Sequence, residues 1–269
     1  MENDAFPAGV EAAWGLRDRP VKGPKRGLTL DGIITAAVAI ADGEGAEAVS
    51  MSRVAKELGS STMALYRYVA TKDELVTLMV DSAVGAPAPL PDDVTGWRAG
   101  LEYWCVSMRE ALLRHPWAIG LVAASGGPPI TPNQLAWLDQ SLRILSGTRL
   151  GHGEKIAITL LVSGQVRSEA SITAILLQDP EGTKRRLAGY KDFLRRVTEN
   201  GRLPALREAV EDGAFDNLDA DAAAESDEFD DFDFGLQRAL DGVAAYLAAT
   251  DDIPVPHSSQ SDPTEATAE

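Results

Sequence analysis

The sequence predicts an all-α protein with a small N-terminal domain and a larger C-terminal domain. Over most of the 269 residues, apolar side chains recur with the spacing of one face of an amphipathic helix. Between residues 50 and 75, two short helical patterns flank a glycine, as in a helix-turn-helix. No region is rich in strand patterns, and no glycine-rich loop has the spacing that binds phosphate. A hydrophobic content of 45% is enough to bury a core in each domain.

Residues 1–27 are rich in proline, glycine and charge and show no apolar periodicity, so we expect a disordered basic arm. Its cationic segment runs from Arg17 to Arg26. Two alternatives are open for this arm: contact with a DNA backbone or minor groove, and solvation without any contact.

The first helix of the N-terminal domain is expected to begin after Thr29, a good N-cap, and to end at Gly43 and Gly45. Its buried stripe is predicted to comprise Ile33, Ile34, Ala37, Val38, Ile40 and Ala41. Together with the helix-turn-helix, this helix makes a three-helix unit.

The first helix of the helix-turn-helix ends at Gly59. Its inner face is predicted to consist of Val54, Ala55 and Leu58. The second helix is expected over residues 62–68, and its N-cap candidates are Ser60, Ser61 and Thr62.

The second helix turns Leu65 and Val69 toward the core, since these residues lie four positions apart. Its opposite side carries Met63 and Arg67, flanked by Ala64 and Tyr66. An arginine can bind guanine with two hydrogen bonds and a thioether can contact the thymine methyl group, so this side suits a major groove. A solvated face on an ordinary helix pair is the alternative.

A connecting helix follows, and Thr71 with Glu74 is expected to form its capping box. Its buried stripe is predicted to comprise Leu75, Leu78, Met79 and Ser82. The N-terminal domain with its connecting helix therefore spans residues 28–84.

The C-terminal domain is expected over residues 85–250. A proline-rich loop over residues 85–91 precedes a helix from near Thr95 to Arg114, and Pro116 breaks that helix. A second loop, residues 125–132, leads into a helix that runs through residue 145. Thr131 is its predicted N-cap and Pro132 its first helical residue.

A long helix over residues 153–178 is apolar on more than one side, so we expect several packing partners. Its small residues would let another helix approach closely: Ala157, Gly164, Ser168 and Ser171. A polar helix over residues 181–199, an acidic linker and a last helix follow. The last helix has an apolar stripe of Phe229, Phe232, Leu236, Leu240, Val243 and Leu247. Residues 251–269 are expected to be a disordered tail.

The runs Leu58-Gly59, Leu65-Tyr66-Arg67-Tyr68-Val69 and Lys72-Asp73-Glu74-Leu75 resemble the N-terminal domain of the TetR family of transcriptional regulators. The resemblance begins at Leu28, is strong to about residue 84 and is weak beyond it. It implies a helix-turn-helix DNA-binding domain and a larger helical domain for ligand binding and dimerisation. It further implies that the long helix and the last helix form a four-helix dimer interface, for which an ordinary intrachain core is the alternative.

The resemblance also assigns DNA contacts residue by residue. Base contacts fall to Thr62, Met63, Ala64 and Arg67, and phosphate contacts to Tyr66, Tyr68 and Lys72. Ser50 and Ser52 lie at the N-terminus of the preceding helix, where the helix dipole favours an anion. The alternatives are that Ser50 or Ser52 only caps its helix, that Tyr68 packs partly on the core, and that Ala64 is present because nothing larger fits.

A formal net charge of -16 argues against DNA binding, because phosphates attract positive charge. The acids concentrate in residues 205–234, where a dense run of Asp and Glu accompanies the single base Arg207. Residues 14–72 instead carry several bases: Arg17, Arg19, Lys22, Lys25, Arg26, Arg53, Lys56, Arg67 and Lys72. We therefore expect a locally basic surface at the helix-turn-helix.

Several classes of protein are disfavoured. The single cysteine, Cys105, allows no internal disulfide and fits a reducing cytoplasm. No long apolar run and no signal-peptide pattern occur, so neither a membrane span nor secretion is expected. The three histidines and Cys105 lack the spacing of a zinc site or a Cys-His nucleophile pair, and we expect no catalytic site, metal or cofactor.

These features predict a ligand-responsive, sequence-specific DNA-binding transcriptional regulator in the cytoplasm. We expect a homodimeric repressor on double-stranded DNA with a palindromic operator, released by a small hydrophobic or aromatic effector. The candidate effector-binding residues are Trp104, Met108, His115, Trp117 and Gln165, each with plain core packing as its alternative. A function of another class is also open: a helical small-molecule-binding protein or enzyme that has lost operator binding.

Overall fold

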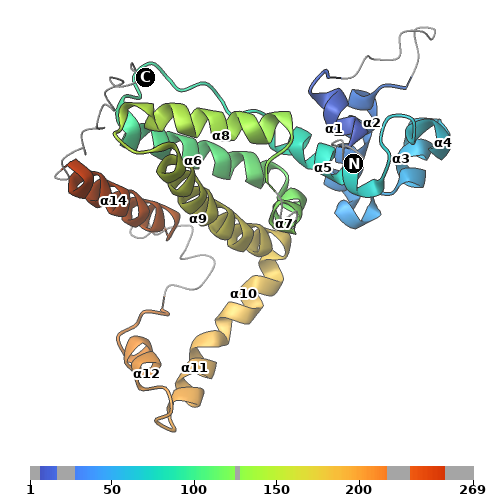
Figure 1. The fold of residues 1–269 in the computed structure, drawn as a ribbon. Coiled ribbons are helices and arrows are strands. Elements are labelled where there is room, and N and C mark those ends of the chain that lie inside the picture. Colours follow the sequence, from blue (N-terminus) through green and yellow to red (C-terminus); the bar gives the residue numbers. More distant parts are fainter. Residues whose placement is uncertain (1–6, 17–27, 125–127, 217–230, 252–269) are drawn as a thin grey trace, which may run out of the picture.

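The computed structural model describes residues 7–16, 28–124, 128–216 and 231–251. Within these ranges the chain is helical and contains no β-strand, which confirms the all-α class. The N-terminal lobe consists of α1 (Ala8–Ala13), α2 (Leu30–Glu44), the 3₁₀ turn η1 (Ala46–Ala48), α3 (Met51–Glu57) and α4 (Thr62–Leu65). Helix α5 (Lys72–Val84) leads from this lobe into the C-terminal domain (Figure 1).

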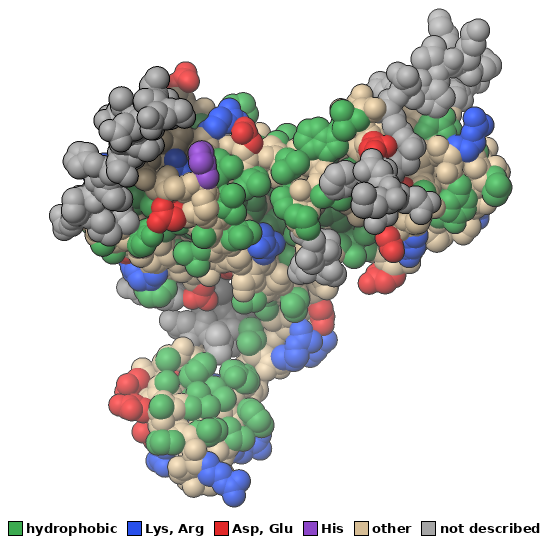
Figure 2. Space-filling view, viewed as in Figure 1, with side chains coloured by type: hydrophobic (Ala, Val, Ile, Leu, Met, Phe, Trp, Pro, Cys, Tyr) green, Lys and Arg blue, Asp and Glu red, His purple; other side chains and the backbone are tan. Residues whose placement is uncertain are grey.

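The C-terminal domain has a bundle and a projecting arm (Figure 1). The bundle comprises α6 (Gly96–Arg114), α7 (Pro116–Ala124), α8 (Pro132–Ile144), the 3₁₀ turn η2 (Leu145–Gly147), α9 (His152–Gln178) and α14 (Asp231–Asp251). The arm comprises α10 (Pro180–Ala188), α11 (Tyr190–Thr198) and α12 (Pro204–Glu211). Hydrophobic side chains gather on the visible face of the arm (Figure 2). The exposed hydrophobic residues of the arm include Tyr190, Phe193 and Leu203.

Helix α2 begins as expected. The Thr29 hydroxyl accepts a hydrogen bond from the Gly32 N–H at 3.0 Å, and Gly45 ends the helix with φ of +88°. The expected stripe is buried except Val38, which is half-buried. This stripe packs against α3, α4 and α5 in the N-terminal core, whose fully buried members include Ile33, Val54, Leu65 and Met79.

The expectation of a disordered arm over residues 1–27 is wrong for residues 7–16, which contain α1. Val10 is buried in the N-terminal core, and the Gly9 N–H donates to the Glu74 carboxylate on α5. Trp14 donates its indole N–H to the Ile130 carbonyl at 2.8 Å, so α1 also contacts the C-terminal domain. These tertiary contacts order a short helix that has little stability alone. Residues 17–27, with the cationic segment, lie outside the described part.

The capping box of α5 is half present. The Thr71 hydroxyl accepts from the Glu74 N–H at 3.0 Å, but the Glu74 carboxylate accepts from the N–H groups of Ala70 and Gly9, not from that of Thr71. The prediction that Ser82 is buried is also wrong, because it is exposed and the buried stripe continues through Asp81 and Ala83.

The bundle encloses a second core. It comprises Leu101, Trp104, Cys105 and Leu112 from α6 together with apolar residues of α7, α8 and α9. The apolar stripe of α14 is buried in this core at Phe232, Leu236, Leu240 and Val243. The intrachain alternative is therefore correct for that stripe, and a dimer interface would have to use other residues. Phe229 lies outside the described residues.

The segment after α9 differs from expectation. One polar helix was expected over residues 181–199, whereas α10 and α11 are separate helices on either side of Gly189. Helix α12 occupies the start of the expected acidic linker and packs on α11. Residues 217–230 and 252–269, which include most of the remaining linker and nearly all of the expected tail, are outside the described part.

Candidate nucleic-acid interface and effector region

Two serines position the helix-turn-helix. Ser50 caps α3 by accepting from the Arg53 N–H at 3.2 Å, and Ser61 caps α4 by accepting from the Ala64 N–H at 3.3 Å. Gly59 has φ of +58°, a conformation that favours glycine, and this turn sets the direction of α4. Of the three N-cap candidates for the second helix, Ser61 is the one that caps it.

Helix α4 is shorter than the expected helix over residues 62–68. Its α-helical part ends at Leu65, and the chain continues with tighter hydrogen bonds from Arg67 N to Ala64 O and from Tyr68 N to Leu65 O, at 3.4 and 2.8 Å. Such i→i+3 bonds are typical of a 3₁₀ turn at a helix end. The expected inner face is confirmed, because Leu65 and Val69 are fully buried.

The outer side of α4 faces solvent at the tip of the N-terminal lobe (Figure 1). Met63 is 74% exposed and Tyr66 is 47% exposed. Arg67 and Lys72 are also exposed, and no hydrogen bond or ion pair joins either side chain to another described residue. Exposed thioether, phenol and cationic groups without intramolecular partners are available to a ligand on this side of the lobe.

The remaining residues assigned to DNA are less exposed or already engaged. Thr62, Ala64 and Tyr68 are half-buried, and Tyr68 packs on the N-terminal core. The Ser50 hydroxyl, besides capping α3, lies 3.1 Å from the exposed Ser52 hydroxyl. Of the nine assigned residues, Met63, Tyr66, Arg67 and Lys72 are therefore exposed without a side-chain partner among the described residues.

Not every base near this surface is free. Arg53 donates to Glu44 and to Glu57, at 2.7 Å in each case, so its charge is paired within the lobe. Arg67 and Lys72 are therefore better placed than Arg53 to meet a phosphate or a base.

A polar cluster joins α2 to the start of α7. Asp42 Oδ1 lies 2.7 Å from His115 Nδ1 and accepts from the Trp117 indole N–H at 2.7 Å. Burial alone would raise the pKa of Asp42, but the hydrogen bonds from Trp117 and His115 and the charge of His115 outweigh it, so this pKa lies below its usual value. The cluster is a direct contact between the N-terminal lobe and the bundle.

A second polar cluster joins α5 to α8. Thr131 occupies the predicted N-cap position of α8, but its hydroxyl makes no cap bond and donates to the Asp81 carboxylate. Asp81 caps α8 in its place, accepting from the N–H groups of Asn133 and Gln134 at 3.1 Å each. Burial raises the pKa of Asp81 above its usual value, and the hydrogen bonds offset this only in part.

Neither acid is predicted from the sequence as a functional residue, although the position of Asp81 carries a signal. It lies in phase with Leu75 and Leu78 on the buried stripe of α5, and an acid at such a position needs a buried partner. Asp42 gave no comparable signal, since it lies on the exposed side of α2.

The five candidate effector residues do not converge on one cavity. Trp104 is buried, donates to the Trp137 carbonyl at 3.1 Å and packs edge-on against the Trp137 ring. Met108 packs against the bundle core. His115 and Trp117 lie side by side, with ring centroids 5.9 Å apart, and both bind Asp42. Gln165 faces α14, since a Cβ added at Gly235 would lie 2.2 Å from its Nε2 atom.

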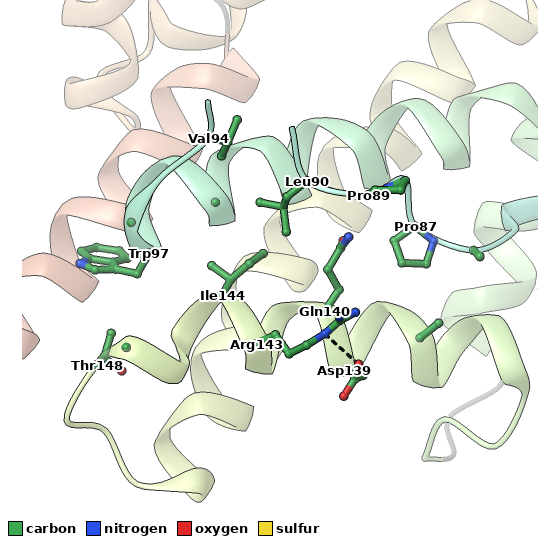
Figure 3. A pocket seen from close by; sticks show the side chains of 15 residues that line it. Pro87, Pro89, Leu90, Val94, Trp97, Asp139, Gln140, Arg143, Ile144 and Thr148 are labelled. Carbon is green, nitrogen blue, oxygen red and sulfur yellow. Dashed lines mark ion pairs between the residues drawn. The ribbon is translucent and has the colours of Figure 1, made fainter. Parts of the chain in front are cut away.

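A cavity of about 850 Å³ lies elsewhere, between α8 and the segment that connects α5 to α6 (Figure 3). We call that segment, residues 85–95, the strap. None of the five candidates lines the cavity. Its walls come from the strap, the start of α6, α8 and η2: Ala86, Pro87, Pro89, Leu90, Val94, Gly96, Trp97, Gly100, Ala136, Asp139, Gln140, Arg143, Ile144, Gly147 and Thr148.

Other site chemistry is sparse within the described ranges. Cys105 is buried in the bundle core as a free thiol, and burial raises its pKa to about 12, with the charge of Glu102 adding to the effect. The described side chains include no group of His, Cys, Asp and Glu that could hold a metal ion. Among the helices described, none is both long and apolar enough to cross a membrane.

Comparison with known proteins extends this picture. Residues 33–79 match the family described as "Bacterial regulatory proteins, tetR family", and residues 89–247 match "Tetracyclin repressor-like, C-terminal domain". The HTH-type transcriptional repressor DrrR1 of Streptomyces coeruleorubidus is 35% identical over 250 residues, which cover 89% of this chain and 86% of the relative.

Solved structures of similar fold include ActR from Streptomyces coelicolor. Apo ActR is 26% identical, with a TM-score of 0.63, covering 86% of this chain and 100% of its own. ActR in complex with (S)-DNPA is 25% identical, with a TM-score of 0.62, covering 82% of this chain and 99% of its own.

Proposed function

The chain belongs to the TetR family of ligand-responsive, DNA-binding transcriptional repressors, and we propose that it acts in the cytoplasm as a homodimer on a palindromic operator. Each subunit would place α4 in a major groove, with the half-sites about one helical turn apart, roughly 34–36 Å. A small hydrophobic or aromatic effector bound in the C-terminal domain would shift α5 and lower operator affinity. Coupling free energies of this kind are about 1–3 kcal/mol.

The observation that carries the DNA-binding proposal is the accessible surface formed by α4, the turn that follows it and the start of α5. Arg67 has no intramolecular partner in the described ranges, so no ion pair must break before its guanidinium meets a guanine edge. Tyr66 and Lys72 flank it with groups that suit phosphates. The caps at Ser50 and Ser61 fix both helices, so these side chains project from a rigid support.

The homodimer is supported by exposed apolar residues on α9, the long helix for which the sequence predicts several packing partners. Leu160, Leu161, Ile172 and Ile175 are each more than half exposed. Between them lie Gly164 and Ser168, small residues that would let a second copy of α9 approach closely. Contiguous apolar surface of this kind is typical of a protein–protein interface.

The test begins with selection from a random double-stranded DNA pool, followed by sequencing of the retained fragments. An enriched palindrome supports both the operator and the two-fold symmetry. Arg67→Ala is then expected to weaken binding to the selected site by about 1–3 kcal/mol and to relax the sequence preference of the protein. Lys72→Ala is expected to weaken binding to all sequences alike and to reduce the salt slope by about one phosphate.

The matched control is Arg196→Ala, which removes the same charge from α11, in the arm far from α4 (Figure 1). It is expected to bind DNA like the parent protein. If Arg67→Ala and Lys72→Ala also bind like the parent, α4 is not the DNA-contacting helix.

A further inference from the structure

We infer that the effector binds in the cavity beneath the strap, and that it is a planar aromatic molecule with one acidic oxygen group at its edge. This inference rests on the proposed function, since it names the site and the ligand class through which the repressor is released.

The strap is held in an unusual way. Prolines at 87, 89 and 91 deprive every second residue of an N–H donor and favour an extended chain without internal hydrogen bonds. The strap carbonyls instead accept from bundle side chains: Gly85 O from Trp137 Nε1 at 2.9 Å, Ala88 O from Gln140 Nε2 at 2.7 Å, and Pro89 O from Tyr103 Oη at 3.4 Å. The strap can therefore lift from α8 by losing a few side-chain hydrogen bonds, without unfolding a helix or strand.

The walls of the cavity suit a flat apolar ring system. Pro87, Pro89 and Leu90 face it from the strap, and Ile144 faces it from α8 (Figure 3). Trp97 closes one end with a half-buried indole ring. A volume of about 850 Å³ lies within the usual range for small-molecule sites, roughly 300–1,000 Å³.

The polar groups of the cavity define the edge of the ligand. Arg143 and Asp139 form an ion pair at 3.0 Å along α8 (Figure 3), with both side chains about two-thirds exposed. An exposed pair of this kind is weak, so a ligand oxygen can replace Asp139 as the partner of Arg143. Arginine binds carboxylates and related anions in a two-pronged geometry. The adjacent Asp139 carboxylate disfavours a ligand with two negative charges, which leaves a monoanion.

The position of the cavity connects it to DNA binding. The strap begins at Gly85, directly after the last residue of α5, and α5 begins at Lys72 beside the DNA-contacting surface. Helix α8 holds the same end of α5 twice, through Trp137 at Gly85 and through its N-terminus at Asp81. A ligand wedged between the strap and α8 would separate the elements that fix the C-terminal end of α5.

The five effector-binding candidates predicted from the sequence provide a less suitable ligand site than this cavity. The Trp104 indole N–H is already bonded to the Trp137 carbonyl, and the Trp117 indole N–H to Asp42. A ligand at either place would have to displace a protein partner from a packed environment, whereas the cavity beneath the strap is already open.

The inference is tested with anthracene-2-carboxylate, a planar aromatic monoanion, and its uncharged carboxamide as probes. Ala136→Leu adds bulk on α8 at the cavity wall, and Leu is favourable in a helix. Ala99→Leu adds the same bulk at an exposed position of α6 that does not line the cavity, and is the matched control. Probe binding is followed by fluorescence of the full-length dimer, and DNA release by anisotropy on the selected operator.

The parent and Ala99→Leu are expected to bind the carboxylate and to release DNA alike. Ala136→Leu is expected to bind it at least tenfold more weakly and to keep its DNA when the probe is added. Arg143→Gln is an exposed change that leaves the core intact. It is expected to lower the affinity for the carboxylate about tenfold and to change the affinity for the carboxamide little. This second variant keeps the test decisive if Ala136→Leu folds poorly.

The inference is overturned if the parent binds neither probe, if both cavity variants bind and respond like the parent, or if probe binding leaves DNA affinity unchanged. Failure of the proposed function looks different, because then the parent enriches no sequence from the DNA pool even without a probe.

Discussion

Asp81→Ala is expected to destabilise the protein at the connection between α5 and α8. Asp81 is 7% exposed, and its carboxylate accepts from the N–H groups of Asn133 and Gln134 at the first turn of α8. It also accepts from the hydroxyl of Thr131, a residue with no exposed surface. One substitution on α5 therefore removes the cap of a helix in the other domain and leaves a buried hydroxyl without an acceptor.

The expected magnitude follows from these contacts. Loss of an N-cap side chain costs about 1 kcal/mol, and a buried polar group left unsatisfied costs about 1–3 kcal/mol more. Burial disfavours the charged carboxylate, as the raised pKa of Asp81 shows. Its removal therefore recovers part of the lost stability. We expect a net loss of about 2–3 kcal/mol, which lowers the midpoint of thermal unfolding by about 4–12 °C for a chain of this size.

Two further variants separate the hydrogen bonds from the charge. Asp81→Asn keeps an oxygen for the N–H groups and the hydroxyl, so it is expected to lose about 1 kcal/mol or less. Ser82→Ala changes the exposed neighbour on α5 and is expected to stay within about 0.5 kcal/mol of the parent.

The pH dependence has a definite sign. Since the pKa of Asp81 is raised in the folded state, its contribution to stability is complete below the usual aspartate pKa and is lost as pH rises through the folded-state pKa. The stability of the parent relative to Asp81→Asn should therefore decrease with rising pH over that interval.

The assay is urea and thermal unfolding followed by circular dichroism and by tryptophan fluorescence, since Trp137 lies on α8. A loss below about 0.5 kcal/mol in Asp81→Ala would refute the assignment of Asp81 as the cap of α8. Equal losses in Asp81→Ala and Asp81→Asn would instead show that charge, and not hydrogen bonding, is what the site requires.

Three other outcomes are expected. Glu74→Ala leaves the N–H groups of Gly9 and Ala70 without their acceptor. It should therefore lower the free energy of unfolding by about 2–3 kcal/mol and speed amide hydrogen exchange in α1. Unchanged exchange in α1 would contradict its docking through Glu74. Leu160→Glu on α9 should convert the proposed dimer to monomer in sedimentation, whereas Val106→Glu on the exposed side of α6 should not. A stable Leu160→Glu dimer would place the interface elsewhere. Cys105, with its pKa raised to about 12, should resist iodoacetamide at pH 8 in the folded protein and react in urea, and rapid labelling of the folded protein would contradict its burial.

Much of the fold could be predicted from local signals. Thr29 and Ser50 cap their helices as side chains of that type do, and Leu65 and Val69 are buried as their spacing required. Such features depend on residues a few positions apart, so they can be predicted from the sequence alone.

Helix α1 could not be predicted in the same way. Its six residues include one apolar anchor of any size, Val10, and isolated helices of this length are not stable. It is ordered because Glu74, more than sixty residues later in the chain, accepts from Gly9, and because Trp14 reaches Ile130. Only the tertiary structure brings these groups together.

The proposed effector site likewise could not be predicted from the sequence, because it depends on tertiary contacts. Trp104, Met108 and Trp117 have the composition of a binding pocket, but composition does not distinguish a pocket from a core. Trp104 packs against Trp137, whereas the cavity is formed by the path of the strap over α8. That path depends on carbonyl contacts of Gly85 and Ala88, which no side-chain pattern reveals.

The contacts between the N-terminal lobe and the bundle suggest why a small ligand would suffice to change DNA affinity. They include directional hydrogen bonds from Trp117 on α7 to Asp42, from the first turn of α8 to Asp81, and from Trp137 to the end of α5. A hydrogen bond of this kind is lost over a short displacement, whereas apolar packing weakens gradually as surfaces slide. The net value of one such bond to a charged group is about 1.5–3 kcal/mol, which overlaps the coupling of about 1–3 kcal/mol between effector and operator sites. Breaking one of these contacts would therefore change the free energy of the connection between α5 and the bundle by an amount comparable with that coupling.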